Sequence, residues 1–115
     1  MKSRSYKDLI VWQKSSQLAK DIYELTNGFP RELASQMRRA AVSISSNIAE
    51  GSKRNTTKDF GRFLVMAQGS ASELESQLRI AKSLPFGIQL DYSKVDSLLI
   101  EIIKMLYVLA RKIGN

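Results

Sequence analysis

Two amphipathic segments of this chain each carry a stripe of polar side chains, and these stripes contain the residues best suited to chemistry. On a helix that turns by about 100° per residue, each stripe lies beside an apolar face. We therefore expect the two stripes to face each other across a helix seam. The first consists of Gln36, Arg39, Ser43, Asn47 and Glu50, and the second, interrupted by Met66, of Asp59, Arg62, Ser70, Glu73 and Gln77.

Two interpretations of these residues compete. In the catalytic one, Glu50 and Glu73 form a carboxylate pair for acid–base work or for a hard metal ion. Di-metal helical bundles add Glu-x-x-His elements, however, and this chain has no His. We therefore favour a satisfied structural network at a helix or subunit seam, with no catalytic or metal-binding residue. Its expected members are Gln36, Arg38, Arg39, Asn47, Glu50 and Glu73.

The composition supports a binding role rather than catalysis. The 115 residues contain neither Cys nor His, which excludes disulfides, thiolate zinc sites, Cys nucleophiles and His proton relays. Eighteen Lys and Arg against eleven Asp and Glu leave a net charge of +7. Such an excess concerns partners more than fold. We expect a protein that is not an enzyme and needs no cofactor.

The basic residues gather at one predicted turn. Lys53, Arg54, Lys58 and Arg62 stand against the single Asp59 between Gly51 and Arg62, next to the start of a predicted helix. Free backbone N–H groups at a helix start favour phosphate, so these four residues are predicted to bind nucleic-acid backbone, with Arg38 and Arg39 as additional candidates. The alternative is an ordinary solvated turn. No Walker A loop, dinucleotide fingerprint or clear recognition helix is present, which predicts weak sequence specificity.

The elements that must position these residues are four helices. Apolar residues recur three or four apart in four segments separated by short joints that hold both prolines and most glycines. We predict helices over residues 6–26 and 30–51, a third capped by Thr56 or Thr57 and closed by the turn at 84–87, and a fourth capped by Ser93. The fold class is all-α: an antiparallel up-down four-helix bundle in a single domain over residues 6–115, after a flexible basic N-terminus of residues 1–5.

The fourth predicted helix is apolar on more than one face. Beyond its main stripe lie Val95, Ile100, Ile103, Tyr107 and Val108. Such a helix is either the best-buried one of the bundle or packs against another subunit, and the sequence alone leaves both open. No apolar stretch is long enough for a signal or a membrane span, so we expect no membrane association and a cytoplasmic location.

One run of residues suggests a family. Residues 36–51, QMRRAAVSISSNIAEG, closely resemble the signature of the bacterial four-helix-bundle proteins named after 23S rRNA intervening sequences. Leu9, Trp12 and the Phe29-Pro30 pair also lie at positions that resemble the family pattern, so the similarity spans nearly the whole chain. The chain lacks several residues that the family often has between Glu32 and Ser35, which predicts a tighter joint.

The resemblance implies an up-down bundle that assembles into a homopentamer and has no established enzymatic activity. A related branch, the accessory variability determinant of diversity-generating retroelements, is a basic pentamer that binds nucleic acid and a reverse transcriptase. Five copies of a chain with a charge of +7 would make repeated weak phosphate contacts act together. We therefore expect an oligomeric module that binds RNA or DNA backbone. The alternative is a pentameric adaptor that docks a protein partner, such as a nucleic-acid enzyme, without touching nucleic acid.

Overall fold

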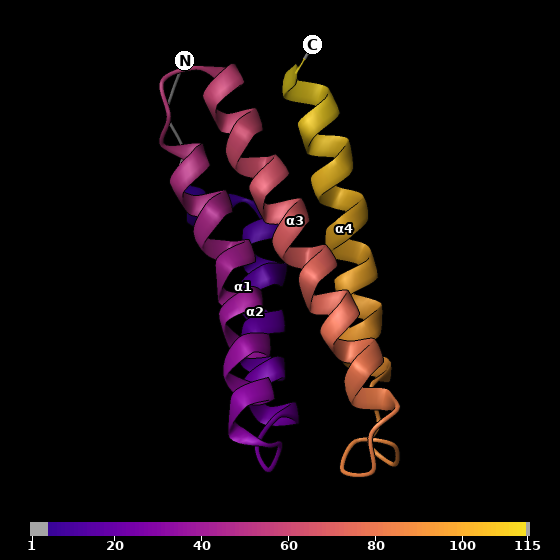
Figure 1. The fold of residues 1–115 in the computed structure, drawn as a ribbon. Helices are drawn as coiled ribbons and strands as arrows, with labels where there is room; N and C mark the ends of the chain where they lie inside the picture. The colour runs from indigo at the N-terminus through magenta and orange to yellow at the C-terminus, as the bar shows by residue number, and fades with distance from the viewer. Residues whose placement is uncertain (1–4, 115) are drawn as a thin grey trace.

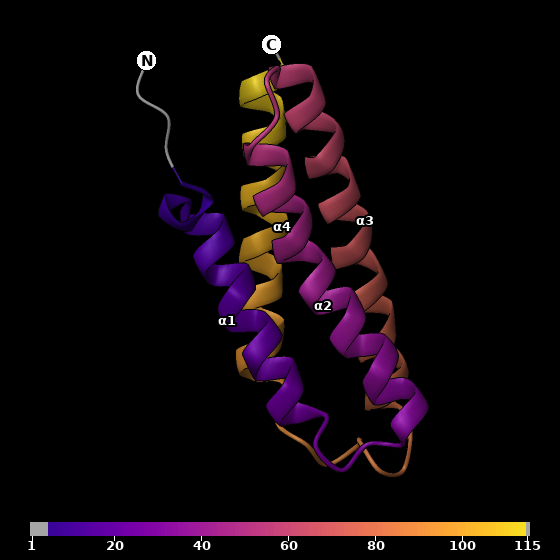
Figure 2. The ribbon, with the colours of Figure 1, turned by 90° about the vertical axis from the view of Figure 1, so that its left-hand side faces the viewer.

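The computed structural model describes residues 5–114, which form one short 3₁₀ turn and four α-helices. The elements are η1 (Tyr6–Asp8), α1 (Ile10–Leu25), α2 (Arg31–Ser52), α3 (Thr57–Lys82) and α4 (Ser93–Gly114). Neighbours in sequence run antiparallel, and α4 returns beside α1, so each helix packs on two others (Figures 1 and 2). The predicted all-α, up-down four-helix bundle is confirmed.

The start of the first helix differs from the prediction. Ser5 caps η1 by accepting a hydrogen bond from the backbone N–H of Lys7, and Leu9 then adopts an extended conformation before α1 begins. The prediction of one continuous helix over residues 6–26 was therefore wrong at its first turn. Within η1, the ring of Tyr6 packs edge-on against Trp12 at 5.0 Å between centroids. Apart from Ser5, the predicted flexible N-terminus lies outside the described residues.

The core runs along the bundle axis. Every helix contributes fully or almost fully buried apolar side chains at helical spacing, with small alanines concentrated on α2 and α3. Small residues allow these two helices to approach closely, and Gly51 near the end of α2 lies directly against the side chains of Phe60 and Phe63 on α3. The close approach fixes where α2 ends and where α3 begins, at the basic turn. The largest completely buried apolar residues are Leu18, Ile22, Met37, Ile44, Ile48, Leu64, Leu74, Leu78, Ile102 and Leu106.

The hydrogen bonds at the N-terminus of α4 differ from the predicted cap. Ser93 is the first residue of the helix rather than its cap, and both its backbone N–H and its hydroxyl donate to the carboxylate of Asp91. Both hydrogen bonds lower the pKa of Asp91 below its ordinary value, and the bond from the backbone N–H has the larger effect. Asp96, in the first turn of α4, accepts a hydrogen bond from Lys82 of α3 at 2.6 Å. Ser93 does not act as the cap because Asp91, two residues upstream, accepts hydrogen bonds from both its backbone N–H and its hydroxyl.

The apolar excess on α4 divides between core and surface. Val95 is buried and Ile103 is partly buried in the core. Ile100, Tyr107 and Val108 are 52%, 57% and 61% exposed, so the bundle itself does not cover them. The helix α4 is therefore a core helix that also presents apolar side chains to the outside, and its packing against another subunit stays a prediction.

Candidate nucleic-acid interface

The turn between α2 and α3 presents the predicted phosphate-binding residues at one end of the bundle. The backbone N–H groups of Lys53 and Arg54 bond back to the carbonyls of Glu50 and Gly51, which terminates α2. Thr56 then caps α3 by accepting the N–H of Asp59 at 3.1 Å. The turn is tight and exposed, and it lies at the end of the molecule where the C-terminus of α4 also lies (Figure 1).

Two of the four predicted cations have acidic partners. Arg54 makes a short ion pair with Glu50, 2.6 Å between nitrogen and oxygen, and its guanidinium lies over the ring of Phe63 at 4.7 Å. Arg62 lies 3.8 Å from the carboxylate of Asp59, a long contact for an ion pair, and its side chain is 69% exposed. A phosphate would have to compete with Glu50 for Arg54 but would find Arg62 largely available.

The two lysines of the turn are freer. Lys53 and Lys58 are both exposed, and within residues 5–114 neither forms an ion pair. The ammonium of Lys53 lies 5.7 Å from the centre of the Tyr6 ring, which draws η1 toward the turn. Lys58 is in the first turn of α3, where the N–H groups of Thr57 and Lys58 precede the first intrahelical bonds. The available positive charge of this end therefore centres on Lys53, Lys58 and Arg62.

The predicted polar network does not form as one unit. Its α2–α3 part is present: the hydroxyls of Ser43 and Ser70 lie 2.8 Å apart across the seam, and the Asn47 amide donates to Ser43. Arg38 instead reaches α1, donating to the hydroxyl of Thr26 at 2.9 Å and to the carbonyl of Tyr23. The reason is helical rotation, since Arg38 lies on the side of α2 that turns toward α1.

The remaining members of that network are at the surface. Gln36, Arg39 and Glu73 are exposed and make no side-chain hydrogen bond or ion pair within the described part of the chain, and Glu50 is committed to Arg54. Sequence reasoning had also grouped Glu50 with Glu73. Gly51 lies against Phe63, so Glu50 is about ten helical residues, or roughly 15 Å, from Glu73 along α3. The two carboxylates are not brought together.

Sequence reasoning missed the cavity at the α1–α2 joint. It has a volume of about 630 Å³ and is lined by Arg31 and by residues of the α1 end in addition to Arg38 and Arg39. A signal for it was present in the sequence. Arg31 occupies the first position of α2, where the helix dipole disfavours a cation. Within residues 5–114, the buried atoms Asp21 Oδ2 and Gln77 Oε1 also lack a hydrogen-bond partner.

Between residues 5 and 114, no cluster of three acidic side chains is arranged to hold a metal ion. None of the helices in that range combines the length and the apolarity needed to cross a membrane.

Comparisons with known proteins agree with the resemblance seen in residues 36–51. No curated protein sequence matches the chain. Among solved structures, a protein of unknown function from the S23 ribosomal protein family of Bacteroides thetaiotaomicron has the same fold, with a TM-score of 0.80 at 24% identity over 88% of this chain and 98% of that one. The family model for the 23S rRNA-intervening sequence protein matches residues 7–108. The chain therefore belongs to the 23S rRNA-intervening sequence protein family.

Proposed function

We propose that this protein is a non-enzymatic module that binds the phosphate backbone of RNA or DNA through the basic α2–α3 turn. The observation that carries the proposal is the exposure of Lys53 and Lys58, without ion-pair partners within the described chain, beside the N-terminus of α3. Exposed cations at a helix start attract phosphate both by their charge and by the backbone N–H groups.

The contacts within the turn indicate which of its residues would bind phosphate most readily. Lys53, Lys58 and Arg62 bind phosphate most readily, because only Arg62 has an acidic neighbour and that contact is 3.8 Å long. Arg54 contributes less, since a phosphate must first displace Glu50 from its 2.6 Å contact. The expected contacts come from lysine and arginine side chains and backbone N–H groups, so binding is expected to depend on backbone charge rather than on base sequence.

The proposal includes an oligomer, for which we expect the homopentamer implied by the family resemblance. Exposed Ile100, Tyr107 and Val108 on α4 support it, because apolar side chains gathered on one helix face favour contact with another subunit. Each additional copy presents another basic turn to the same nucleic acid, which raises affinity without any new kind of contact. Light scattering tests the assembly. A mass near the 13.0 kDa of one chain would contradict it.

Salt-dependent binding tests the interface. The variant Lys53→Glu/Lys58→Glu is compared with Lys20→Glu/Arg79→Glu, which makes the same charge change at exposed positions away from the turn. Loss of two phosphate contacts lowers the slope of log K against log salt by about 1.4 for single-stranded RNA. We expect this decrease and weaker binding for the turn variant only. Equal effects in both variants, or binding unchanged in the turn variant, would refute the assignment.

A second candidate function is a protein-docking adaptor, in which nucleic acid has no direct role. It is favoured by an apolar groove of about 480 Å³ between the start of α1 and the end of α4, lined mainly by Leu9, Ile10, Val11, Met105, Val108 and Leu109. Capture from a nuclease-treated extract separates the two candidates. A partner that survives nuclease and is lost on Val108→Asp supports docking, whereas a partner lost with nuclease supports nucleic-acid binding.

A further inference from the structure

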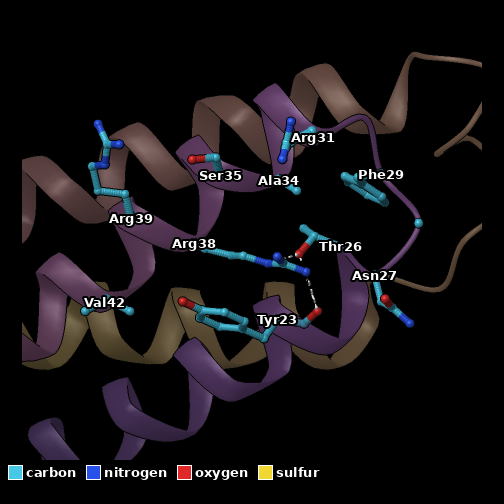
Figure 3. Close-up of a pocket in the computed structure, with 11 residues that line it drawn as sticks. Tyr23, Thr26, Asn27, Phe29, Arg31, Ala34, Ser35, Arg38, Arg39 and Val42 are labelled. Carbon is cyan, nitrogen blue, oxygen red and sulfur yellow. Dashed lines mark hydrogen bonds between the residues drawn. The ribbon is translucent and has the colours of Figure 1, made fainter.

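Three arginines of α2 line the cavity at the α1–α2 joint. It holds about 630 Å³ and is lined by Arg31, Arg38 and Arg39 of α2 and by Tyr23, Thr26 and Asn27 at the end of α1, with no carboxylate among its lining residues (Figure 3). Glu24 and Glu32 are adjacent in sequence to lining residues, and Glu32 lies in an adjoining depression with Arg31 and Arg39. A volume of this size is typical of small-molecule sites.

One of the three arginines is already held in place. The Nε of Arg38 donates to Thr26 Oγ1 at 2.9 Å, its Nη2 donates to the carbonyl of Tyr23 at 3.3 Å, and its guanidinium lies 4.7 Å from the centre of the Tyr23 ring. A guanidinium has five N–H donors, so three remain for a ligand. Because its position is fixed by α1, Arg38 loses little conformational freedom when it binds an anion.

The other two arginines have no comparable structural role. Arg31 and Arg39 are exposed, and within residues 5–114 neither makes an ion pair or a side-chain hydrogen bond. Arg31 is also the first residue of α2, where its charge opposes the helix dipole. In Figure 3, Arg39 extends away from Tyr23 and Thr26, so it closes on a ligand by a rotamer change. Arg31 and Arg38 thus line the cavity without an ion-pair partner within the described residues, and an anion bound there would be contacted by Arg39 after that rotamer change.

We propose that this cavity binds the phosphate monoester of a small organic molecule of about nucleotide size. A phosphate monoester carries a charge of about −1.5 to −2 and three acceptor oxygens, enough to satisfy several guanidinium groups at once, whereas a carboxylate offers one charge and two oxygens. Ser35 and Asn27 add polar groups at the rim, and Phe29 and Val42 add apolar walls for the organic part.

The site is separate from the proposed nucleic-acid interface. The joint lies at one end of α2 and the basic turn at the other, as Figures 1 and 2 show. The 22 residues of α2 span about 33 Å, so no single phosphate group contacts both. The two sites use different residues and can be tested one at a time.

Titration of the full-length protein, followed by amide chemical shifts, tests the proposal with AMP, adenosine and ribose 5-phosphate. AMP and ribose 5-phosphate are expected to shift residues of the joint, and adenosine is not. Arg31→Gln and Arg39→Gln are each expected to weaken AMP binding about tenfold, the loss typical of one charged hydrogen-bonding partner. Arg79→Gln, an exposed arginine on α3, is the matched control and should bind AMP normally. Lys53→Glu/Lys58→Glu should also bind normally, which keeps this test independent of the proposed function.

The source of the phosphate is distinguished by comparing AMP with RNA trinucleotides that carry a 5′-phosphate or a 5′-hydroxyl. Preference for the 5′-phosphorylated trinucleotide assigns the site to nucleic-acid ends, and preference for AMP assigns it to free nucleotides. Absence of binding for every phosphorylated probe at millimolar concentration would overturn the proposal. So would equal binding of adenosine, or equal weakening by Arg79→Gln, because either result would show that the cavity does not recognise phosphate specifically.

Discussion

The helices α2 and α3 are in close contact at Gly51, and the substitution Gly51→Ala tests how rigid that contact is. A Cβ atom at this position would lie 2.6 Å from Cβ of Phe63 and 2.9 Å from a ring carbon of Phe60. The Phe60 ring can rotate away. The Phe63 Cβ is bonded directly to the α3 backbone, so it moves only if the whole helix moves.

The expected effect follows from two opposing contributions. Carbon atoms in contact normally lie about 3.5–4.0 Å apart, so α3 must shift by about 1 Å near Phe63. Overpacking of this kind destabilises by about 1–3 kcal/mol. Alanine recovers at most about 1 kcal/mol of helix propensity, and less at Gly51 because it lies in the last turn of α2. The net loss is about 1–2 kcal/mol, or a Tm lower by about 4–8 °C for a domain of this size.

Urea unfolding followed by circular dichroism at one fixed protein concentration measures the change, since association would otherwise alter the apparent stability. Gly69→Ala and Gly61→Ala are matched controls, because a Cβ at either position of α3 meets no atom within 4 Å. Both should leave stability unchanged or raise it by up to about 1 kcal/mol. A Gly51→Ala protein as stable as these controls would show that the helices separate freely and would refute the reasoning.

Three further predictions concern single contacts. Ser43→Ala should lower stability by about 1 kcal/mol by unpairing the hydroxyl of Ser70, while Asn47 keeps its bond to the Ser43 carbonyl, and Ser43→Ala/Ser70→Ala should lose less than the sum of the single changes in a double-mutant cycle. Thr26→Val should also lower the free energy of unfolding by about 1 kcal/mol, because it removes the acceptor for Arg38. Burial, and less strongly Asp96, raises the pKa of Tyr92 above 10.0. The protonated Tyr92 side chain therefore contributes its full stabilisation below pH 10.0, and this stabilisation is lost as the pH rises through the folded-state pKa. The free energy of unfolding should consequently fall less at alkaline pH in Tyr92→Phe than in the wild type.

The fold was predictable because apolar periodicity extends over whole helices. Errors occurred where a few residues decide the local backbone. Leu9 continues the apolar pattern of α1 yet is extended, because Ser5 starts a separate turn before it. Serine is a residue type that often caps helices, but the N–H group of Ser93 instead donates a hydrogen bond to Asp91. In both places a local hydrogen bond from a nearby polar side chain outweighs a pattern that is summed over many residues.

The candidate sites were less predictable because a helical projection gives the direction of a side chain but not its reach. Ser43 and Ser70 are short, so their positions on the helices determined their contact across the seam. Arg38 is long, and its partners lie 12 and 15 residues earlier in the chain, on α1. Which neighbouring helix receives an arginine depends on the packing of the complete bundle, and the arginine-lined cavity at the joint follows from that packing.

The way the helices are joined also determines where the positive charge is left unpaired. Within the described residues, the ion pairs that cross between helices all involve α4: Lys14 with Glu101, Lys94 with Asp21, and Lys82 with Asp96. The helix α2 is held instead by small apolar residues, by the Ser43–Ser70 contact and by the neutral partners of Arg38. The carboxylates of these pairs lie on α1 and α4, and none of these pairs involves α2. The exposed arginines at one end of α2 and the lysines beyond its other end therefore have no ion-pair partner within the described residues. Within the described residues, both ends of α2 therefore carry exposed cations without ion-pair partners, and we propose that each end binds a different phosphate.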